Sequence, residues 1–214
     1  MASPSNVTIW NLSGKWMGNR SKSDDPEPSL KLQGIGWALR KAIICANPVV
    51  CISAYTSTQE KTPSTYIDTI FRTPVADILD ARVLNWQKIK HTDFIFGSVN
   101  CQTTWIGGLV GEEGRTRPNI QGSIGDEKAT KFLRGEILAD GSKCDGFLVE
   151  ERYGKEEALW IHTIDQHEDG HWMDETMWGF ELINGERYHT RRVITMDNKT
   201  GRYELVRVVF LFIE

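Results

Sequence analysis

Hydrophobic residues alternate with polar residues through most of the chain from Val49 onward. This period of two is typical of β-strands, whose side chains point alternately to opposite faces of a sheet. Polar or proline-containing turns separate the runs, and Asn184-Gly185 is a strong hairpin signal. The predicted strands cover residues 14–20, 49–56, 65–73, 76–86, 93–106, 146–153, 158–167, 171–183, 186–196 and 202–213. About ten strands without alternating helices predict an all-β fold, a single antiparallel barrel over residues 1–214.

One segment near the start of the chain breaks this rhythm. Between residues 30 and 46 the apolar side chains recur at helical spacing, which is three to four residues. They are Ile35, Leu39, Ala42, Ile43 and Ala46. Pro48 ends the helix, because the residue before a proline disfavours the α conformation, and Gly34 and Gly36 interrupt it earlier. We expect a short helix-turn-helix lid over the mouth of the barrel.

A second interruption lies in the middle of the chain. Residues 107–128 are rich in glycine and charge and contain few large apolar side chains, which predicts a long loop or excursion from the barrel. Residues 127–137 fit a helical turn or a strand about equally well. The excursion is a candidate docking surface for another protein, with the barrel as its scaffold.

Composition narrows the classes of function. The net charge is -4 and the pI about 5.8, which gives no general attraction to nucleic acid or to an anionic membrane. No apolar stretch is long enough to span a bilayer, and the N-terminus lacks the pattern of a secretory signal. Four cysteines without C-x-x-C spacing do not indicate a zinc ribbon or a redox motif. We therefore expect a cytoplasmic protein with reduced thiols; its oligomeric state stays open.

Two stretches resemble a known family. Gly14-Lys15-Trp16 is the G-x-W that begins the barrels of the calycin superfamily, and residues 32–52 resemble the helical lid of intracellular fatty-acid-binding proteins. Residues 175–189 with 203–210 look like that family's last hairpins. The resemblance, which extends to lipocalin-like fungal proteins, covers roughly the first 55 and the last 45 residues. It implies a barrel with a ligand in its lumen.

The same resemblance predicts an unusual ligand site. Many fatty-acid-binding proteins hold the ligand carboxylate with two arginines and a tyrosine. Here Arg207 matches the arginine of the last strand, but Val209 stands at the tyrosine position and Phe180 at the second arginine. Because a carboxylate in a low-dielectric cavity needs several donors, ordinary fatty-acid carriage is not expected. An apolar lumen with a few polar groups remains.

Strand alternation then selects the side chains that face the lumen. If Phe180 points inward, so do Trp178 and Asp174, and hairpin geometry places His189 and Arg191 inside. If Arg207 points inward, so does Tyr203. The opposite face of residues 186–196 is about equally apolar, so a one-residue shift in register would reverse that strand. The candidate catalytic residues are His189, Arg191 and Asp174, and the candidate ligand-binding residues are Trp16, Trp37, Trp178, Phe180, Tyr203 and Arg207.

These residues suit chemistry within an apolar cavity. A histidine can act as a general acid or base, and an arginine can stabilise negative charge that develops on a carbonyl oxygen. We expect the lumen to bind a hydrophobic small molecule, such as a polyketide or terpenoid, and to catalyse its cyclisation or isomerisation without a cofactor. A non-catalytic carrier of a hydrophobic ligand is the alternative.

Other features have simpler interpretations. His167 and His171 have H-x-x-x-H spacing, but Asp169-Gly170 between them predicts a hairpin turn in which the two rings need not converge, so we expect no metal site. Arg187, Arg191 and Arg192 form a basic cluster, for which phosphate binding is one interpretation and pairing with cross-strand glutamates is the expected one. Arg207 has a structural alternative too, since in calycins a late arginine often packs over the tryptophan of the G-x-W motif.

Overall fold

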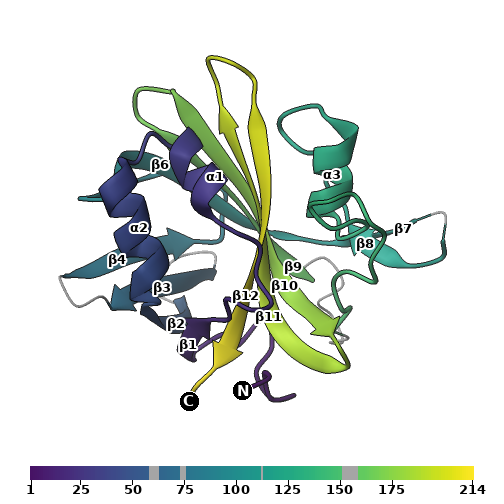
Figure 1. Ribbon diagram of the computed structural model, residues 1–214. Coiled ribbons are helices and arrows are strands. Elements are labelled where there is room, and N and C mark those ends of the chain that lie inside the picture. Colours follow the sequence, from purple (N-terminus) through teal and green to yellow (C-terminus); the bar gives the residue numbers. More distant parts are fainter. Residues whose placement is uncertain (58–62, 73–75, 112, 151–158) are drawn as a thin grey trace.

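A computed structural model describes residues 1–57, 63–72, 76–111, 113–150 and 159–214. Its main element is a ten-stranded antiparallel sheet rolled into a barrel (Figure 1). Along the sheet the order is β4-β3-β2-β1-β12-β11-β10-β9-β6-β5. The strands are β1 (Gly14–Gly18), β2 (Val49–Ser57), β3 (Ser64–Arg72), β4 (Asp77–Val83), β5 (Ile89–Asp93), β6 (Gly97–Ile106), β9 (Trp160–His167), β10 (Trp172–Ile183), β11 (Glu186–Asp197) and β12 (Tyr203–Phe212).

The helices between the first two strands form the predicted pair. They are α1 (Glu27–Leu32) and α2 (Trp37–Ala46), with Gly34 at φ 79° in the turn that joins them. The Arg40 side chain fixes their relative position by bonding Glu27 at 2.9 Å and the Ile35 carbonyl at 2.5 Å. An antiparallel barrel with a helix pair after its first strand is the calycin-like architecture that the sequence predicted, and that prediction is confirmed.

The barrel has one open seam. Within the described residues β4 and β5 form the two edges of the sheet and exchange no ladder hydrogen bonds. Arg82 of β4 spans the seam inside the barrel, because its guanidinium bonds both oxygens of Asp165 in β9 at 2.9 and 2.8 Å. Side chains therefore complete the wall that backbone pairing leaves unfinished.

The N-terminal segment closes one end of the barrel. Val7, Ile9 and Leu12 are buried together with Trp16, whose indole nitrogen donates to the Leu12 carbonyl at 3.1 Å. Both chain ends lie at the end of the barrel away from α1 (Figure 1). The chain before β1 is thus part of the core, and the space inside the barrel is confined to the end beneath the helices.

The glycine-rich excursion is folded rather than a simple loop. It carries the short strands β7 (Gly108–Val110) and β8 (Thr116–Pro118) and the helix α3 (Glu127–Leu133), and it lies outside the barrel (Figure 1). Phe132 and Leu133 of α3 form a second core with Met177 and Ile194. This core explains why both faces of β11 are apolar, since one face lines the lumen and the other supports the excursion.

Two strand predictions are wrong. Residues 93–106 are not one strand, because residues 94–96 form a turn between β6 and β5, a strand that the pattern did not predict. Residues 146–150 form no strand and make only the isolated bridge between Phe147 and Glu181, and the rest of the predicted run, 151–153, lies outside the described residues. Phe147 instead packs against Trp160 within the second core. The alternating pattern there reflects burial under the excursion and not membership of the barrel.

Candidate functional site

A continuous cavity lies between the helix pair and the floor of the barrel. It has a larger part of about 660 Å³ and a smaller part of about 360 Å³, which share lining residues. Side chains of α2 and of the strands make most of its surface apolar. The residues common to both parts are Gln33, Ile43, Pro48, Phe71, Arg82, Phe96, Asp165, Asp174 and Arg191. The apolar lumen with polar groups is therefore present, and α2 covers it as a lid.

Strand parity is as predicted on two of the three strands. The lumen contains Asp174 and Trp178 from β10 and Arg191 from β11, which fits the predicted faces. On β12 the predicted face is wrong, because Val206, Val208 and Phe210 line the cavity. The prediction took its parity from the arginine of the resemblance, whereas the valines and Phe210 give β12 an apolar inner face of the opposite parity.

Tyr203 and Arg207 consequently point away from the cavity. Tyr203 donates its hydroxyl to Asp126 at 2.8 Å, at the start of α3. Arg207 makes an ion pair with Glu181 at 3.3 Å, so it neither binds a luminal ligand nor covers Trp16. Trp37, on α2, is 67% exposed and does not line the cavity either.

Arg191 is the most distinctive group in the lumen. Its guanidinium lies over the ring of Trp178, 3.6 Å from the centroid, because these residues are direct partners across β10 and β11. Its Nη2 atom is buried and has no hydrogen-bond partner among the described residues. Burial, reinforced by the nearby Arg82, lowers the pKa of Arg191 to about 9. The group is therefore cationic at neutral pH, with one donor unused.

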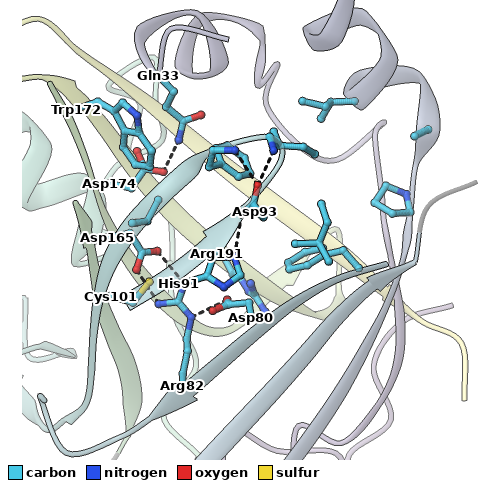
Figure 2. Close-up of a pocket in the computed structure, with 18 residues that line it drawn as sticks. Gln33, Asp80, Arg82, His91, Asp93, Cys101, Asp165, Trp172, Asp174 and Arg191 are labelled. Carbon is cyan, nitrogen blue, oxygen red and sulfur yellow. Dashed lines mark hydrogen bonds and ion pairs between the residues drawn. The ribbon is translucent and has the colours of Figure 1, made fainter. Parts of the chain in front are cut away.

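Asp174 occupies the opposite part of the cavity, beneath the lid. Gln33, which follows α1, donates its amide to one carboxyl oxygen of Asp174 at 2.7 Å (Figure 2). The other oxygen, Oδ1, is buried without a partner among the described residues. Burial raises the pKa of Asp174 to about 7, and the Asp165 carboxylate acts in the same direction. Near neutral pH much of this group carries a proton, and the carboxyl can then donate a hydrogen bond.

The two groups are well separated. Asp174 pairs with Thr195, which stands four residues from Arg191 along β11, and this spacing corresponds to about 13 Å of strand. The backbone therefore holds the two groups at different depths of the cavity. A molecule that reaches both must extend from the lid to the floor of the cavity.

An ionic cluster forms the wall by the seam. Arg82 bonds Asp80 at 2.8 Å as well as Asp165, and all three side chains line the cavity (Figure 2). Burial opposes the charge of Arg82, but Asp165 and Asp80 outweigh it and hold its pKa well above the usual value. Unlike Arg191, this cation is fully paired. It shapes the wall and contributes a field to the lumen.

His189 lies beneath the cavity floor. It is fully buried among the rings of Trp16, Phe180 and Phe210, and its Nδ1–H donates to the Gly179 carbonyl at 3.0 Å. Burial, with the charge of Arg191, lowers its pKa well below the ordinary value, so the ring is neutral. Its Nε2 atom accepts a long contact of 3.5 Å from Arg191. His189, Trp16 and Phe180 do not line the cavity, and they support Arg191 and Trp178 from below.

Sequence reasoning missed Gln33, Asp80, Arg82 and Asp165. A signal existed in the strand at 76–86, where Asp80 and Arg82 stand two residues apart and so share one face. Asp165 shares parity with Thr163 and Ile161, a face that also contains a core residue. Opposite charges at luminal positions of strands that are distant in sequence can be joined only after the barrel closure is known.

Comparisons with known proteins assign the chain to no family. No family model matches the chain. It is 27% identical over 195 residues to a probable pericyclase, scpY, of Mollisia scopiformis, covering 90% of this chain and 86% of the relative. It is 24% identical over 207 residues to the pericyclase pydY of an Acremonium species, covering 96% and 95%. Among solved structures, apo lipid binding protein 8 of Caenorhabditis elegans is 12% identical over 94% of this chain, at a TM-score of 0.49.

Within the described residues, no helix is long and apolar enough to cross a bilayer.

Proposed function

We propose that the protein is a pericyclase that closes a ring in an apolar small molecule of polyketide or terpenoid type within the barrel lumen. Both curated relatives carry the name pericyclase, and each similarity extends over nine tenths or more of this chain. The observation that carries the proposal is Arg191, a buried cation with an unused donor in an apolar cavity. The binding of an apolar ligand does not by itself require a buried cation with an unused hydrogen-bond donor.

The chemistry follows from the placement of Arg191. In a pericyclic ring closure π bonds are converted into σ bonds in one cyclic redistribution of electrons, and no proton or leaving group is released. Arg191 donates to a carbonyl oxygen of the substrate and draws electron density from the conjugated system that reacts. Because the donor is fixed before the substrate binds, the stabilisation requires little reorganisation. No step of this ring closure calls on a cofactor.

The rest of the cavity holds the substrate in a reactive shape. The apolar walls and the lid confine a flexible chain to folded conformations, which raises the effective concentration of the reacting ends. Asp174 donates to a second polar group of the substrate near the lid. In this assignment Arg191 and Asp174 contact the substrate, whereas His189 is a positioning residue that acts through Arg191.

A carrier function is the second candidate, and the mostly apolar lumen under a lid supports it. The two functions differ in what happens to the ligand. A carrier releases the molecule that it bound, whereas a pericyclase releases an isomer of equal mass and different ring count.

The test uses linear polyenes that carry one conjugated ketone and that cyclise slowly in buffer. The purified protein is mixed with each compound, and products are separated by chiral chromatography. We expect faster ring closure and a single stereoisomer, and we expect Arg191→Met to lose this acceleration while Arg207→Met, the matched outward-facing arginine of β12, retains it. The proposal fails if the polyenes bind, as shown by tryptophan fluorescence, but cyclise at the buffer rate into the buffer mixture of isomers. That result supports the carrier.

A further inference from the structure

The turn between β9 and β10 brings together three metal-ligating side chains. Ligand atoms of His167, Asp169 and His171 all lie within 4.8 Å of one another, and the two imidazole rings are 4.1 Å apart between centroids. The expectation that these rings need not converge is therefore overturned, although the turn itself was predicted. Gly170, at φ 70°, closes it by donating its amide to the His167 carbonyl at 2.8 Å.

Neighbouring hairpins hold the backbone of this turn in place. The Glu168 amide donates to the Ser98 carbonyl at 2.8 Å, from the start of β6. On the other side Asn198 donates its side-chain amide to the Gly170 carbonyl at 2.8 Å and its backbone amide to His171 at 3.0 Å. A ligand set on a fixed backbone loses little conformational entropy when an ion binds, so this turn is well prepared for one.

We propose that His167, Asp169 and His171 form a binding site for a divalent transition-metal ion such as Zn²⁺. Ligand distances of about 2.0–2.2 Å place donor atoms roughly 3.3–3.6 Å apart around a tetrahedral ion. The present spacing therefore needs a movement on the order of 1 Å, which rotation of side chains supplies. The Asp169 side chain is 81% exposed, and its carboxylate already lies 3.9 Å from Nδ1 of His167.

The donor types select the metal. Two imidazoles and one carboxylate suit Zn²⁺, Co²⁺, Ni²⁺ or Cu²⁺, whereas Mg²⁺ and Ca²⁺ prefer an all-oxygen set. Three protein ligands leave a coordination position for water or for a ligand atom from outside. The site thus has the composition of an open metal centre.

The position of the site connects it to the mouth of the barrel. Trp172, the next residue after His171, lines the lumen and packs on the ring of His167 with centroids 5.8 Å apart. A Cβ atom placed on Gly34, in the turn between α1 and α2, would lie 3.8 Å from Nε2 of His171. An ion bound here sits at the rim, beside the junction of the lid helices. The site rests on this turn alone and does not depend on the proposed ring closure.

The experiment uses untagged full-length protein, freed of metal with a chelator and kept reduced. Zn²⁺ binding is measured by calorimetry, and Co²⁺ is added in parallel because its visible spectrum reports the ligand type. We expect one ion per chain and a Co²⁺ spectrum typical of nitrogen and oxygen ligands. His171→Ala and Asp169→Asn should each weaken binding by about tenfold or more.

Glu168→Gln is the matched control. This residue is in the same turn, but its carboxylate pairs with Lys90 at 2.7 Å, so its loss should change the affinity by less than about twofold. Circular dichroism checks that each variant is folded. The proposal is overturned by wild-type protein that binds neither ion at millimolar concentration. It is equally overturned by His171→Ala binding as tightly as wild type, or by thiolate charge-transfer bands, which would place the ion on cysteines.

Discussion

Chemically similar residues on the two faces of the β10–β11 hairpin differ in their hydrogen bonding. Arg191 faces the lumen with an unused donor, whereas Arg192, the next residue, faces the excursion and bonds Glu181 through two nitrogens at 2.8 and 2.9 Å. Arg192 also donates to the carbonyls of Phe132 and Ile137 and to the thiol of Cys144. Burial opposes the charge of Arg192, but Glu181 outweighs burial and raises its pKa.

The acidic residues repeat this contrast. Asp174 faces the lumen with a raised pKa, while Glu175 faces outward, bonds His162 at 2.9 Å and accepts from the Ser123 amide at 2.7 Å. Burial favours the neutral form of Glu175, but these partners outweigh burial and lower its pKa. Satisfied charges on the outer face attach the excursion to the barrel. On the inner face of this hairpin, Arg191 and Asp174 each keep one buried polar atom without a hydrogen-bond partner among the described residues.

The largest expected effect comes from removing Arg192, the arginine on the outer face. Arg192→Met leaves Glu181 buried with less compensation and removes the donors to the Phe132 and Ile137 carbonyls, so we expect a loss of about 3–5 kcal/mol in the free energy of unfolding. Urea denaturation measures it. The double variant with Glu181→Met should recover part of the loss, and a single variant as stable as wild type would contradict the assigned role.

Removal of the inner arginine should have the reverse outcome. Arg191→Met takes a poorly compensated cation out of the lumen, so the free energy of unfolding should stay equal or rise. The rate of ring closure should fall about 100-fold, the typical effect of losing one preorganised donor. Arg191→Lys keeps the charge without the fork of donors and should give an intermediate rate. A large loss of stability in Arg191→Met would contradict the claim that the outer arginine stabilises the fold and the inner one does not.

The inner carboxyl should impose a pH dependence that the outer one lacks. The pKa of Asp174 is about 7, above the ordinary value of 3.8, so the folded state holds a proton that the unfolded state has released between these pH values. Its contribution to stability is present at low pH and is lost as the pH rises from about 4 to 7. The reaction rate should fall up to tenfold for each pH unit above 7. Asp174→Asn should flatten both profiles and Glu175→Gln should leave the midpoint near 7, as urea denaturation and rate measurements across pH can show.

The smallest effect is expected at His189. His189→Phe removes the weak 3.5 Å contact with Arg191 but keeps a ring in the aromatic packing, so the rate should fall about threefold. Because the ring is neutral already, the pH–rate profile should keep its shape. Loss of one limb of that profile would show instead that His189 transfers a proton. Initial rates across pH separate these outcomes.

The fold could be predicted because its determinants are local. Alternation, the Asn184-Gly185 turn and the helical spacing before Pro48 all act within a few residues. The inward parity of β10 and β11 followed from Phe180 and the length of that hairpin. The inward residues of one strand predict those of the next strand in a hairpin, because the register of an antiparallel pair fixes the faces of both strands.

The site was harder to predict because its determinants are distant in sequence. Arg82 meets Asp165 only after the barrel has closed, and Arg207 faces outward because Glu181 and the excursion satisfy that side of the sheet. Trp37 is on the lid but on its solvent side. In each case the partner that decides the role of the side chain lies on a segment far along the chain.

The seam between β4 and β5 gives the cavity an adjustable circumference. Elsewhere the sheet is held by repeated backbone hydrogen bonds, but between β4 and β5 the luminal wall is completed by the bonds of the Arg82 guanidinium to the Asp165 carboxylate, with the Trp86 amide bonding the Thr103 carbonyl at the end of the seam. Exchanging Arg82 and Asp165 for shorter or longer side chains can therefore narrow or widen the space without shifting a strand. Related barrels could acquire substrates of different girth through changes at two residues.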